Sequence, residues 1–118
     1  MNFSTKKIFL VVILPLALAC KSAPDPPRDA IDAETMSKII ADIHLAEAKV
    51  SRLSFHEFDS TKAAFKYYEQ KIFAKYKVDT AQYRKSYDFY AANPEYMTAI
   101  YDKAVKILEK KKEKKTVD

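Results

Sequence analysis

The chain has 118 residues and not one glycine. Glycine is the residue that adopts positive φ at no steric cost, so tight β-hairpins, phosphate-cradling loops and dinucleotide fingerprints depend on it. Helices tolerate its absence best. No alternating apolar and polar pattern of useful strand length is present either. The composition therefore predicts a helical protein without loop-based nucleotide sites.

Apolar residues recur at spacings of three and four, as one face of an amphipathic helix requires. The first such segment follows Asp32, which can N-cap a helix, and fades where a connection over residues 54–58 begins. A second helix starts at Asp59 or Ser60 and is closed by Val78. The residues predicted to face inward from these two helices are Met36, Ile39, Ile40, Ile43, Ala46, Val50, Leu53, Phe65, Tyr68, Ile72, Phe73 and Tyr76.

Two further helices are predicted from their capping signals. Asp79 with Gln82 three residues later resembles a capping box and opens a short helix that stops at residues 91–92. Asn93-Pro94 then opens the last helix, with asparagine as the N-cap and proline at the first position, where its missing N–H costs nothing. The inward residues are Tyr83, Tyr87 and Tyr90 on the third helix and Met97, Ile100, Tyr101, Ala104 and Leu108 on the fourth.

The N-terminus carries the features of an export signal. Lys6 and Lys7 precede the uncharged apolar run 8–19, whose 12 residues are too few for the roughly 20 that span a bilayer. The run ends in Ala19-Cys20, and Leu16 to Cys20 resembles a lipobox, the site where diacylglycerol joins the cysteine thiol before cleavage. An ordinary signal with an incidental cysteine is the alternative. Against it, Cys20 is the only cysteine, so no disulfide within the chain claims it.

These features predict the layout of the chain. Residues 1–19 are a lipoprotein signal peptide, and residues 20–31 are the lipidated Cys20 with a Pro-rich linker. Residues 32–109 form the helical domain, and residues 110–118 form a Lys-rich tail. The predicted fold class is all-α, a small bundle of three to four helices after the cleaved signal and tether. Covalent diacylglycerol and an acyl chain such as palmitate on Cys20 are expected, and no other cofactor.

The linker places the domain at a distance from the lipid. Three prolines in residues 21–29 favour polyproline II, which gives roughly 28 Å of reach. Lys21 is not the aspartate that retains lipoproteins in the inner membrane of some bacteria, and no acidic run typical of surface export follows. We therefore expect an outer-membrane lipoprotein that faces the periplasm.

Charge is concentrated at the C-terminal end. After residue 19 the chain holds 19 basic and 16 acidic residues, a net charge of +3, and residues 103–118 alone carry +4. A nucleic-acid-binding domain would gather basic residues over the domain itself, so no nucleic acid is expected as a partner. Lysines at a helix C-terminus commonly complement the helix dipole. Attraction to anionic lipid headgroups is the alternative for this tail.

A family resemblance rests on several phrases of the sequence. They are Ile43-His-Leu-Ala-Glu-Ala48, Tyr67-Tyr68, Ile72-Phe73, Ser86-Tyr-Asp-Phe-Tyr90, Asn93-Pro94-Glu95 and Ile100-Tyr101-Asp102. With the lipid anchor, they resemble the small bacterial lipoproteins catalogued as domain of unknown function 4296, from about Ala33 to Leu108. The resemblance implies an anchor and one helical domain, and no known activity. The Tyr-rich short helix after Tyr76 is also similar to helical parts of periplasmic chaperones that handle outer-membrane proteins.

The residues offer little catalytic chemistry. His44 and Glu47 stand at i, i+3, with Asp42 nearby and His56 on the next connection. This pair can contribute metal ligands, but a zinc site needs a third, so a polar pair between helices is the competing interpretation. The single thiol is assigned to lipid, and a Gly-x-Ser-x-Gly elbow is impossible without glycine. We expect no enzymatic activity.

The aromatic residues suggest a protein partner. Eight tyrosines and five phenylalanines follow the signal, more than so small a core needs, and tyrosine is favoured at interfaces. The candidate partner-binding residues are Phe55, Phe58, Tyr67, Tyr83, Tyr87 and Tyr90. For Phe55 and Phe58, capping of the bundle end is the equal alternative. The expected function is a lipid-anchored interaction module of an envelope complex, in outer-membrane protein assembly or transport. The alternative is a periplasmic carrier of a small ligand or metal that uses the Asp42, His44 and Glu47 region.

Overall fold

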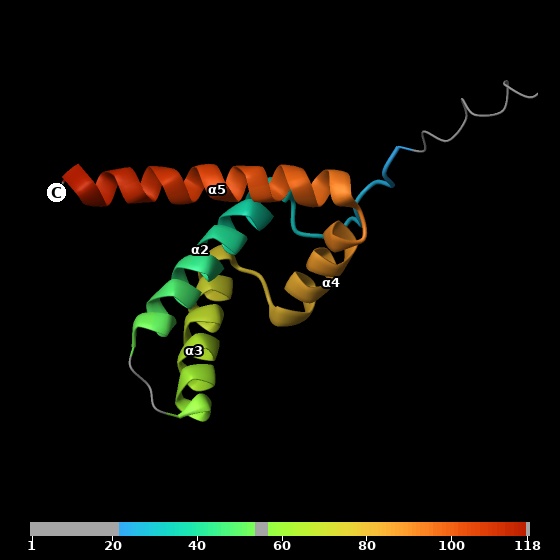
Figure 1. Ribbon diagram of the computed structural model, residues 1–118. Coiled ribbons are helices and arrows are strands. Elements are labelled where there is room, and N and C mark those ends of the chain that lie inside the picture. The colour runs from blue at the N-terminus through green and yellow to red at the C-terminus, as the bar shows by residue number, and fades with distance from the viewer. Residues whose placement is uncertain (1–21, 54–56, 118) are drawn as a thin grey trace, which may run out of the picture.

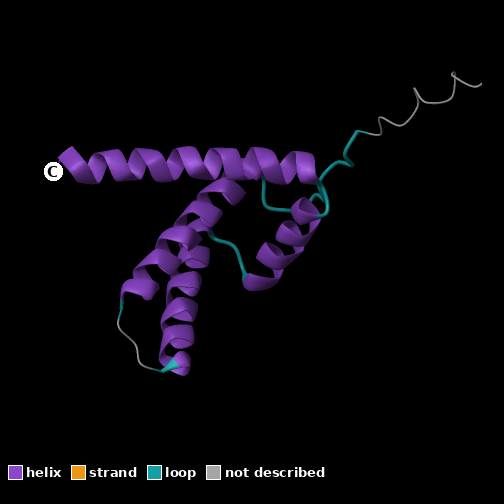
Figure 2. Cartoon of the chain, in the orientation of Figure 1, coloured by secondary structure: helices purple, strands orange, loops and turns teal. Residues whose placement is uncertain are grey.

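The computed structural model describes residues 22–53 and 57–117. Over these two ranges the chain forms four helices and no strand, which confirms the predicted all-α fold class (Figures 1 and 2). The predicted signal peptide, the cleavage site between Ala19 and Cys20, and three residues of the predicted connection, Ser54, Phe55 and His56, lie outside the described residues. None of the four helices is long and apolar enough to cross a membrane.

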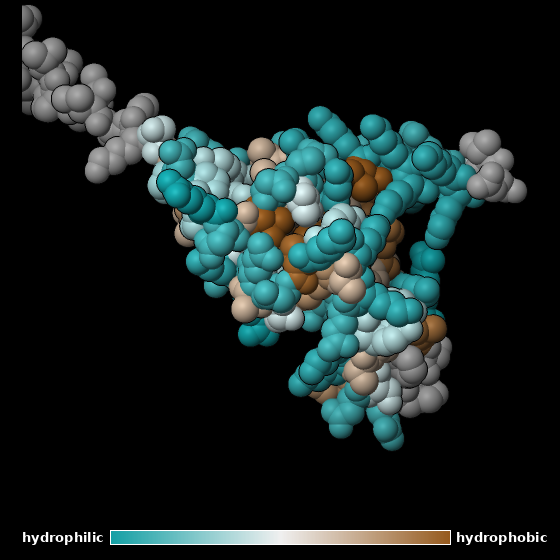
Figure 3. All heavy atoms as spheres, turned by 180° about the vertical axis from the view of Figure 1, so that it is seen from behind, coloured by the Kyte–Doolittle hydropathy of each residue, from teal (hydrophilic) through white to brown (hydrophobic). Residues whose placement is uncertain are grey.

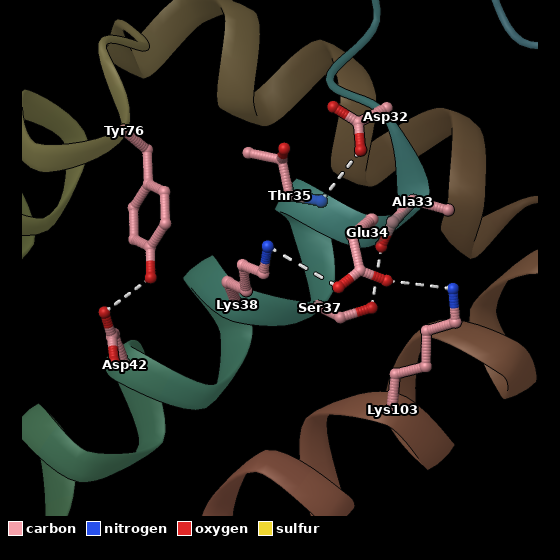
Figure 4. A network of polar contacts seen from close by, with 9 residues as sticks. All are labelled: Asp32, Ala33, Glu34, Thr35, Ser37, Lys38, Asp42, Tyr76 and Lys103. Atoms are coloured by element: carbon pink, nitrogen blue, oxygen red, sulfur yellow. Dashed lines mark hydrogen bonds and ion pairs between the residues drawn. The ribbon is translucent and has the colours of Figure 1, made fainter.

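Helix α2 spans Ala33–Arg52 and begins where its capping signal predicted. The Asp32 carboxylate accepts a hydrogen bond from the Thr35 backbone N–H at 2.9 Å (Figure 4). This bond satisfies one of the amides that a helix N-terminus leaves without an intrahelical acceptor. The buried side chains of α2 are Met36, Ser37, Ile39, Ile40, Ala41, Ala46 and Val50.

Helix α3 spans Phe58–Tyr76 and starts one residue before the predicted range. Its end shows how the chain manages without glycine. Lys77 takes the left-handed conformation, φ 55° and ψ 41°, that glycine usually supplies at this position. The Lys77 N–H donates to the Ala74 carbonyl at 3.2 Å, and the Val78 N–H donates to the Phe73 carbonyl at 3.0 Å. This pair of bonds is a Schellman motif, so Val78 closes the helix as predicted.

Helix α4 spans Thr80–Ala91, and only half of its predicted capping box is present. The Asp79 carboxylate accepts from the Gln82 backbone N–H at 2.8 Å, as predicted. The Gln82 side chain does not return to Asp79, however. Its Nε2 donates to the Asp29 carbonyl at 3.2 Å, because the N-terminal segment runs alongside α4 and offers that acceptor.

Helix α4 holds the N-terminal segment through a set of bonds that we call the α4 clasp. The Ile31 backbone N–H donates to Ser86 Oγ at 2.8 Å, and Tyr90 Oη donates to the Ile31 carbonyl at 2.6 Å. Lys85 forms an ion pair with the Asp29 carboxylate. Ile31 itself is buried. The clasp therefore fixes both the backbone and the side chain of Ile31 immediately before α2 begins.

Helix α5 spans Pro94–Val117, so it continues past residue 110, where the Lys-rich tail was predicted to begin. Pro94 occupies the first position as predicted, and the Asn93 carbonyl accepts from the Met97 N–H at 3.2 Å. The Asn93 side chain serves the preceding helix, because its amide donates to the Phe89 carbonyl at 2.7 Å. Asn93 therefore joins the end of α4 to the start of α5.

Helix α2 lies at the centre of the fold. It packs against α3 as an antiparallel pair, α5 lies across its N-terminal part, and α4 packs against α5 (Figure 1). Ion pairs at the crossing join Glu34 of α2 to Lys38 of the same helix and to Lys103 of α5 (Figure 4). The buried residues of the core are Ile31, Met36, Ile39, Ile40, Ala41, Ala46, Ile72, Phe73, Tyr90, Ile100 and Ala104. They come from all four helices and from the segment that the α4 clasp holds.

Candidate interaction surface

Two large apolar side chains are exposed where α2 ends and α3 begins. Leu53, at the end of α2, is 41% exposed, and Phe58, the first residue of α3, is 81% exposed. We call these two residues the hairpin end. The connection between them, residues 54–56, lies outside the described part of the chain. Leu53 was predicted to face the core, so its exposure corrects that prediction.

The hairpin end continues the apolar stripes that build the core. Phe58, Phe65 and Ile72 are seven residues apart, close to two turns, so they follow one line along α3. Burial fades along this line: Ile72 is buried, Phe65 is half-buried and Phe58 is exposed. On α2 the change is sharper, from Val50 at 4% to Leu53. Both stripes run past the last covered layer, which explains why core-type residues reach the surface here.

The exposure of Phe58 decides between the two alternatives for that residue. A phenylalanine that caps the end of a bundle is covered by the layer beneath it, and Phe58 is not. Most of the surface seen from behind is hydrophilic, and apolar side chains show mainly where the helices meet (Figure 3). The hairpin end departs from that rule. Phe55, its predicted companion, lies outside the described residues.

Tyr67 is exposed but does not share a face with Phe58. Nine residues of helix turn through about 180°, so Tyr67 lies on the opposite side of α3. Its ring meets the Tyr68 ring edge-on at 5.6 Å between centroids, and Lys71 Nζ lies 4.6 Å from its centroid. The Tyr67 hydroxyl beside it raises the pKa of the Lys71 ammonium. The two candidate partner-binding residues Phe58 and Tyr67 therefore do not form one surface on α3.

The tyrosines of α4 belong to the core side of the molecule. Tyr83 lies 4.8 Å from the Phe73 ring between centroids, and Tyr87 lies 5.9 Å from Tyr83. Burial, with the neighbouring Tyr87, raises the pKa of Tyr83 to about 12. Tyr90 is 1% exposed, and its hydroxyl donates to the Ile31 carbonyl in the α4 clasp. Tyr90 cannot reach a partner in this fold, which corrects its assignment as a partner-binding residue.

The three residues of the predicted carrier site do not converge. His44 Nδ1 lies 3.0 Å from Glu47 Oε2 in a polar pair within α2, and the His44 ring lies 6.1 Å from the Tyr101 ring of α5 between centroids. Asp42 points elsewhere: its Oδ2 accepts from Lys75 Nζ at 2.7 Å and from Tyr76 Oη at 2.8 Å. Among the described residues, no three His, Cys, Asp or Glu side chains are grouped to hold a metal.

Asp42 instead ties three helices together. It lies on α2 and receives Lys75 and Tyr76 from α3 and Lys111 from α5. Burial opposes ionisation of the Asp42 carboxyl, but the hydrogen bonds from Lys111, Lys75 and Tyr76 outweigh it and hold the pKa below the ordinary value. A ligand at this carboxylate would have to displace two lysines. The cluster therefore stabilises the arrangement of α2, α3 and α5.

The buried hydroxyls are engaged by the backbone. Ser37 Oγ donates to the Ala33 carbonyl at 2.6 Å, and Ser86 Oγ donates to the Gln82 carbonyl at 2.8 Å while it accepts from Ile31. Sequence reasoning missed the part that Ser86 plays in the clasp. A serine inside a helix gives no periodic signal, and its partner Ile31 is 55 positions away.

Comparison with known proteins identifies the family. No curated protein and no solved structure matches the chain. Residues 27–114 match the family described as Domain of unknown function (DUF4296). The match covers all of α2, α3 and α4 and most of α5, and it agrees with the resemblance found in the sequence. This chain belongs to the DUF4296 family.

Proposed function

We propose that this protein is a lipid-anchored, periplasm-facing, non-enzymatic interaction module of the outer membrane. In this proposal Cys20 carries the diacylglycerol and acyl chain, and the helical domain binds a protein of an envelope complex. Outer-membrane protein assembly or transport is the setting we favour. The export signal and lipobox-like residues before Cys20 support the anchor. Several acyl chains hold a protein stably on a bilayer, which one chain alone does not.

The exposed hairpin end is the observation that carries the binding part of the proposal. Exposed apolar side chains contribute binding energy when a partner removes them from water, at about 25 cal/mol per Å². Phenylalanine offers a large rigid area for this purpose. Phe58 and Leu53 stand together at one end of the α2–α3 pair with no layer of this chain's described residues over them. The partner we infer presents an apolar pocket or groove that accepts this end.

The position of the hairpin end suits a module held by its N-terminus. The segment from residue 22 enters beside the junction of α4 and α5, whereas the last turn of α2 and the first turn of α3 lie at the far end of the hairpin (Figure 1). A helix of 20 residues such as α2 is about 30 Å long. The α4 clasp fixes the end of the tether to the bundle. The hairpin end is therefore presented away from the attachment point.

Affinity purification from detergent-solubilised membranes tests the binding. The full chain with a C-terminal tag should retain a partner in constant ratio, and Leu53→Ala with Phe58→Ala should lose it. The matched control is Leu45→Ala with Tyr67→Ala, since these side chains are 39% and 52% exposed but lie away from the hairpin end. Equal recovery of the partner with both double variants would contradict the proposed site.

Labelling tests the anchor. Cys20→Ala should leave an uncleaved precursor that takes up no labelled palmitate, because the thiol that forms the thioether is missing. Gel mobility and radiolabel incorporation in cells measure both effects. Normal cleavage and labelling of Cys20→Ala would refute the lipoprotein assignment.

A further inference from the structure

The last two turns of α5 carry a concentrated positive charge. Residues 109–116 are all exposed, and the end of α5 is covered with hydrophilic side chains (Figure 3). This helical end extends beyond the rest of the bundle (Figure 1). Residues 110–117 hold five lysines and one glutamate. Of the five, Lys111 is paired with Asp42. No ion pair within the described chain engages the other four.

The lysines are sorted into a row of like charge. Lys106, Lys110 and Lys114 are spaced by four, so they lie along one side of α5 over about 12 Å of helix axis. We call these three residues the lysine row. Like charges at i, i+4 destabilise a helix, whereas alternating Glu and Lys at that spacing stabilise it. Glu109 and Glu113 stand three residues after Lys106 and Lys110, so an acidic line runs beside the row on the helix surface. The row itself carries three positive charges in line.

The side chains of the lysine row are exposed, but they do not share one direction. Lys106 is two positions after Ala104, which is 1% exposed, and two residues turn a helix through about 200°, so Lys106 points away from the core. Lys110 and Lys114 lie nearer the side of α5 that carries the ion pairs of Lys103 and Lys111 with α2. All three are exposed, and no ion pair within the described chain engages them. The row can therefore meet a surface without breaking a contact between α5 and α2.

The chemistry of this end fits a lipid surface better than a protein. Residues 109–116 contain no apolar and no aromatic side chain, which the centre of a protein interface needs. Every basic residue of α5 is lysine, a flexible point charge, and none is arginine, whose planar fork suits defined partners. Lysines near an anionic headgroup surface are attracted without a fixed geometry.

The tether and α5 start from the same corner of the molecule. Ser22, Ala23 and Pro24 line one hollow together with Asn93, Pro94 and Glu95 at the start of α5. Ser22 is only two residues after Cys20, an extended reach of about 7 Å, and α5, with 24 residues, is about 36 Å long. A membrane that holds Cys20 is therefore within reach of the lysine row.

We propose that the lysine row binds the anionic lipid headgroups of the membrane that holds the Cys20 anchor, so that α5 lies along the surface. This inference rests on the proposed lipid anchor. It gives the domain two attachments, the acyl chains and the lysine row. The α2–α3 pair extends away from one side of α5 (Figure 1). A membrane held against another side of α5 would keep the hairpin end away from the lipid.

Lysine footprinting on vesicles tests the proposal. The mature, lipidated chain is incorporated into vesicles of phosphatidylcholine alone or with about one-third phosphatidylglycerol, and its lysines are acetylated with a water-soluble reagent. The acetylation rates of Lys106, Lys110 and Lys114 should fall severalfold in the anionic vesicles only. The rates should recover at about 0.5 M NaCl, because salt screens exposed charges. Lys62 and Lys66, exposed on α3, are the internal controls and should react equally in both vesicles.

A fluorescent label near the hairpin end measures orientation. A dye on Glu57→Cys should transfer less energy to a lipid-bound acceptor in anionic vesicles than in neutral ones. The triple variant Lys106→Gln, Lys110→Gln, Lys114→Gln should abolish that difference. Lys62→Gln with Lys66→Gln should keep it. Equal transfer in both vesicles for the unchanged row would overturn the proposal.

The remaining outcomes separate this inference from the proposed function. If the chain washes off both kinds of vesicle, the lipid anchor itself is wrong, and the proposed function fails with it. If the chain stays bound and the row reacts equally in both vesicles, only this inference fails. Protection that needs envelope proteins or nucleic acid, and is absent on pure lipid, would also overturn it.

Discussion

The α4 clasp and the hairpin end each hold one aromatic residue, which is buried in the clasp and exposed at the hairpin end. In the clasp, Tyr90 is 1% exposed, and its hydroxyl is bound to the Ile31 carbonyl. At the hairpin end, Phe58 is 81% exposed. The difference arises because a second segment of chain crosses α4, whereas none of the described residues covers the first turn of α3. An aromatic residue on a helix is therefore available to a partner only where no other segment of the chain packs over it.

The comparison also separates stability from recognition. The clasp combines apolar burial with hydrogen bonds to backbone groups, so changes there should lower the free energy of unfolding. The hairpin end makes few internal contacts, so changes there should affect a partner and leave folding intact. Variants at each place can sharpen or break this contrast.

The largest effect is expected from Tyr90→Ala. The change removes a fully buried ring and the donor that satisfies the Ile31 carbonyl, and truncation of a buried aromatic costs about 3–5 kcal/mol. A domain of this size has a free energy of unfolding of only about 5–10 kcal/mol, so much of it should be lost. Urea denaturation followed by circular dichroism measures the change. A shift below about 1 kcal/mol would mean that the clasp is not part of the core.

A smaller loss is expected from Ser86→Ala. The substitution leaves the buried Ile31 N–H without its acceptor at 2.8 Å, and an unsatisfied buried donor costs about 1–3 kcal/mol. The change removes only one oxygen atom, so packing should change little. Ser51→Ala, on the exposed side of α2, is the matched control and should stay within about 0.5 kcal/mol of the unchanged protein. Equal effects of the two variants would argue against the hydrogen bond to Ile31.

The next effect concerns Asp42 and pH. Its pKa is lower in the folded protein than in the unfolded chain, so it stabilises the fold above its ordinary pKa, and that stabilisation is lost as pH falls through the folded value. Asp42→Asn should cost about 1 kcal/mol at neutral pH and flatten the acid side of the stability profile. Denaturant midpoints between neutral and acid pH measure it. Asp88→Asn, exposed on α4, is the control, and an equal flattening there would remove Asp42 from the explanation.

The helices were predictable because their signals are local. Asp32 and Asp79 accept the predicted capping bonds, and Pro94 starts the last helix. The apolar periodicity found the buried positions Ile39, Ile72 and others, since one helical face repeats every three or four residues. Local signals of this kind fixed the fold class and four helices in the described chain.

The site was less predictable, because exposure depends on contacts between distant segments. Tyr90 and Phe58 are both aromatic residues of predicted helices, but Tyr90 is covered by the core and by residues 29–31, whereas no described residue covers Phe58. The Gln82 side chain also depends on a distant segment, because it donates to the Asp29 carbonyl and does not complete the capping box. The sequence placed Asp42 near a possible metal site, but in the fold its carboxylate pairs with Lys75 of α3 and Lys111 of α5.

The smallest effect on stability is expected at the hairpin end. Leu53→Ala with Phe58→Ala removes side chains that are already largely in water, so the free energy of unfolding should change by less than about 0.5 kcal/mol. Phe73→Ala is the matched control on the same helix, because Phe73 is 4% exposed and its truncation should cost about 3–5 kcal/mol. Thermal melts of the three proteins give the comparison directly. If the double variant unfolds as readily as Phe73→Ala, the hairpin end is part of the core and its exposure cannot explain partner binding. If the double variant melts at the same temperature as the unchanged protein and still loses the partner, the contrast with the α4 clasp holds. Recognition and stability then reside in different parts of the domain.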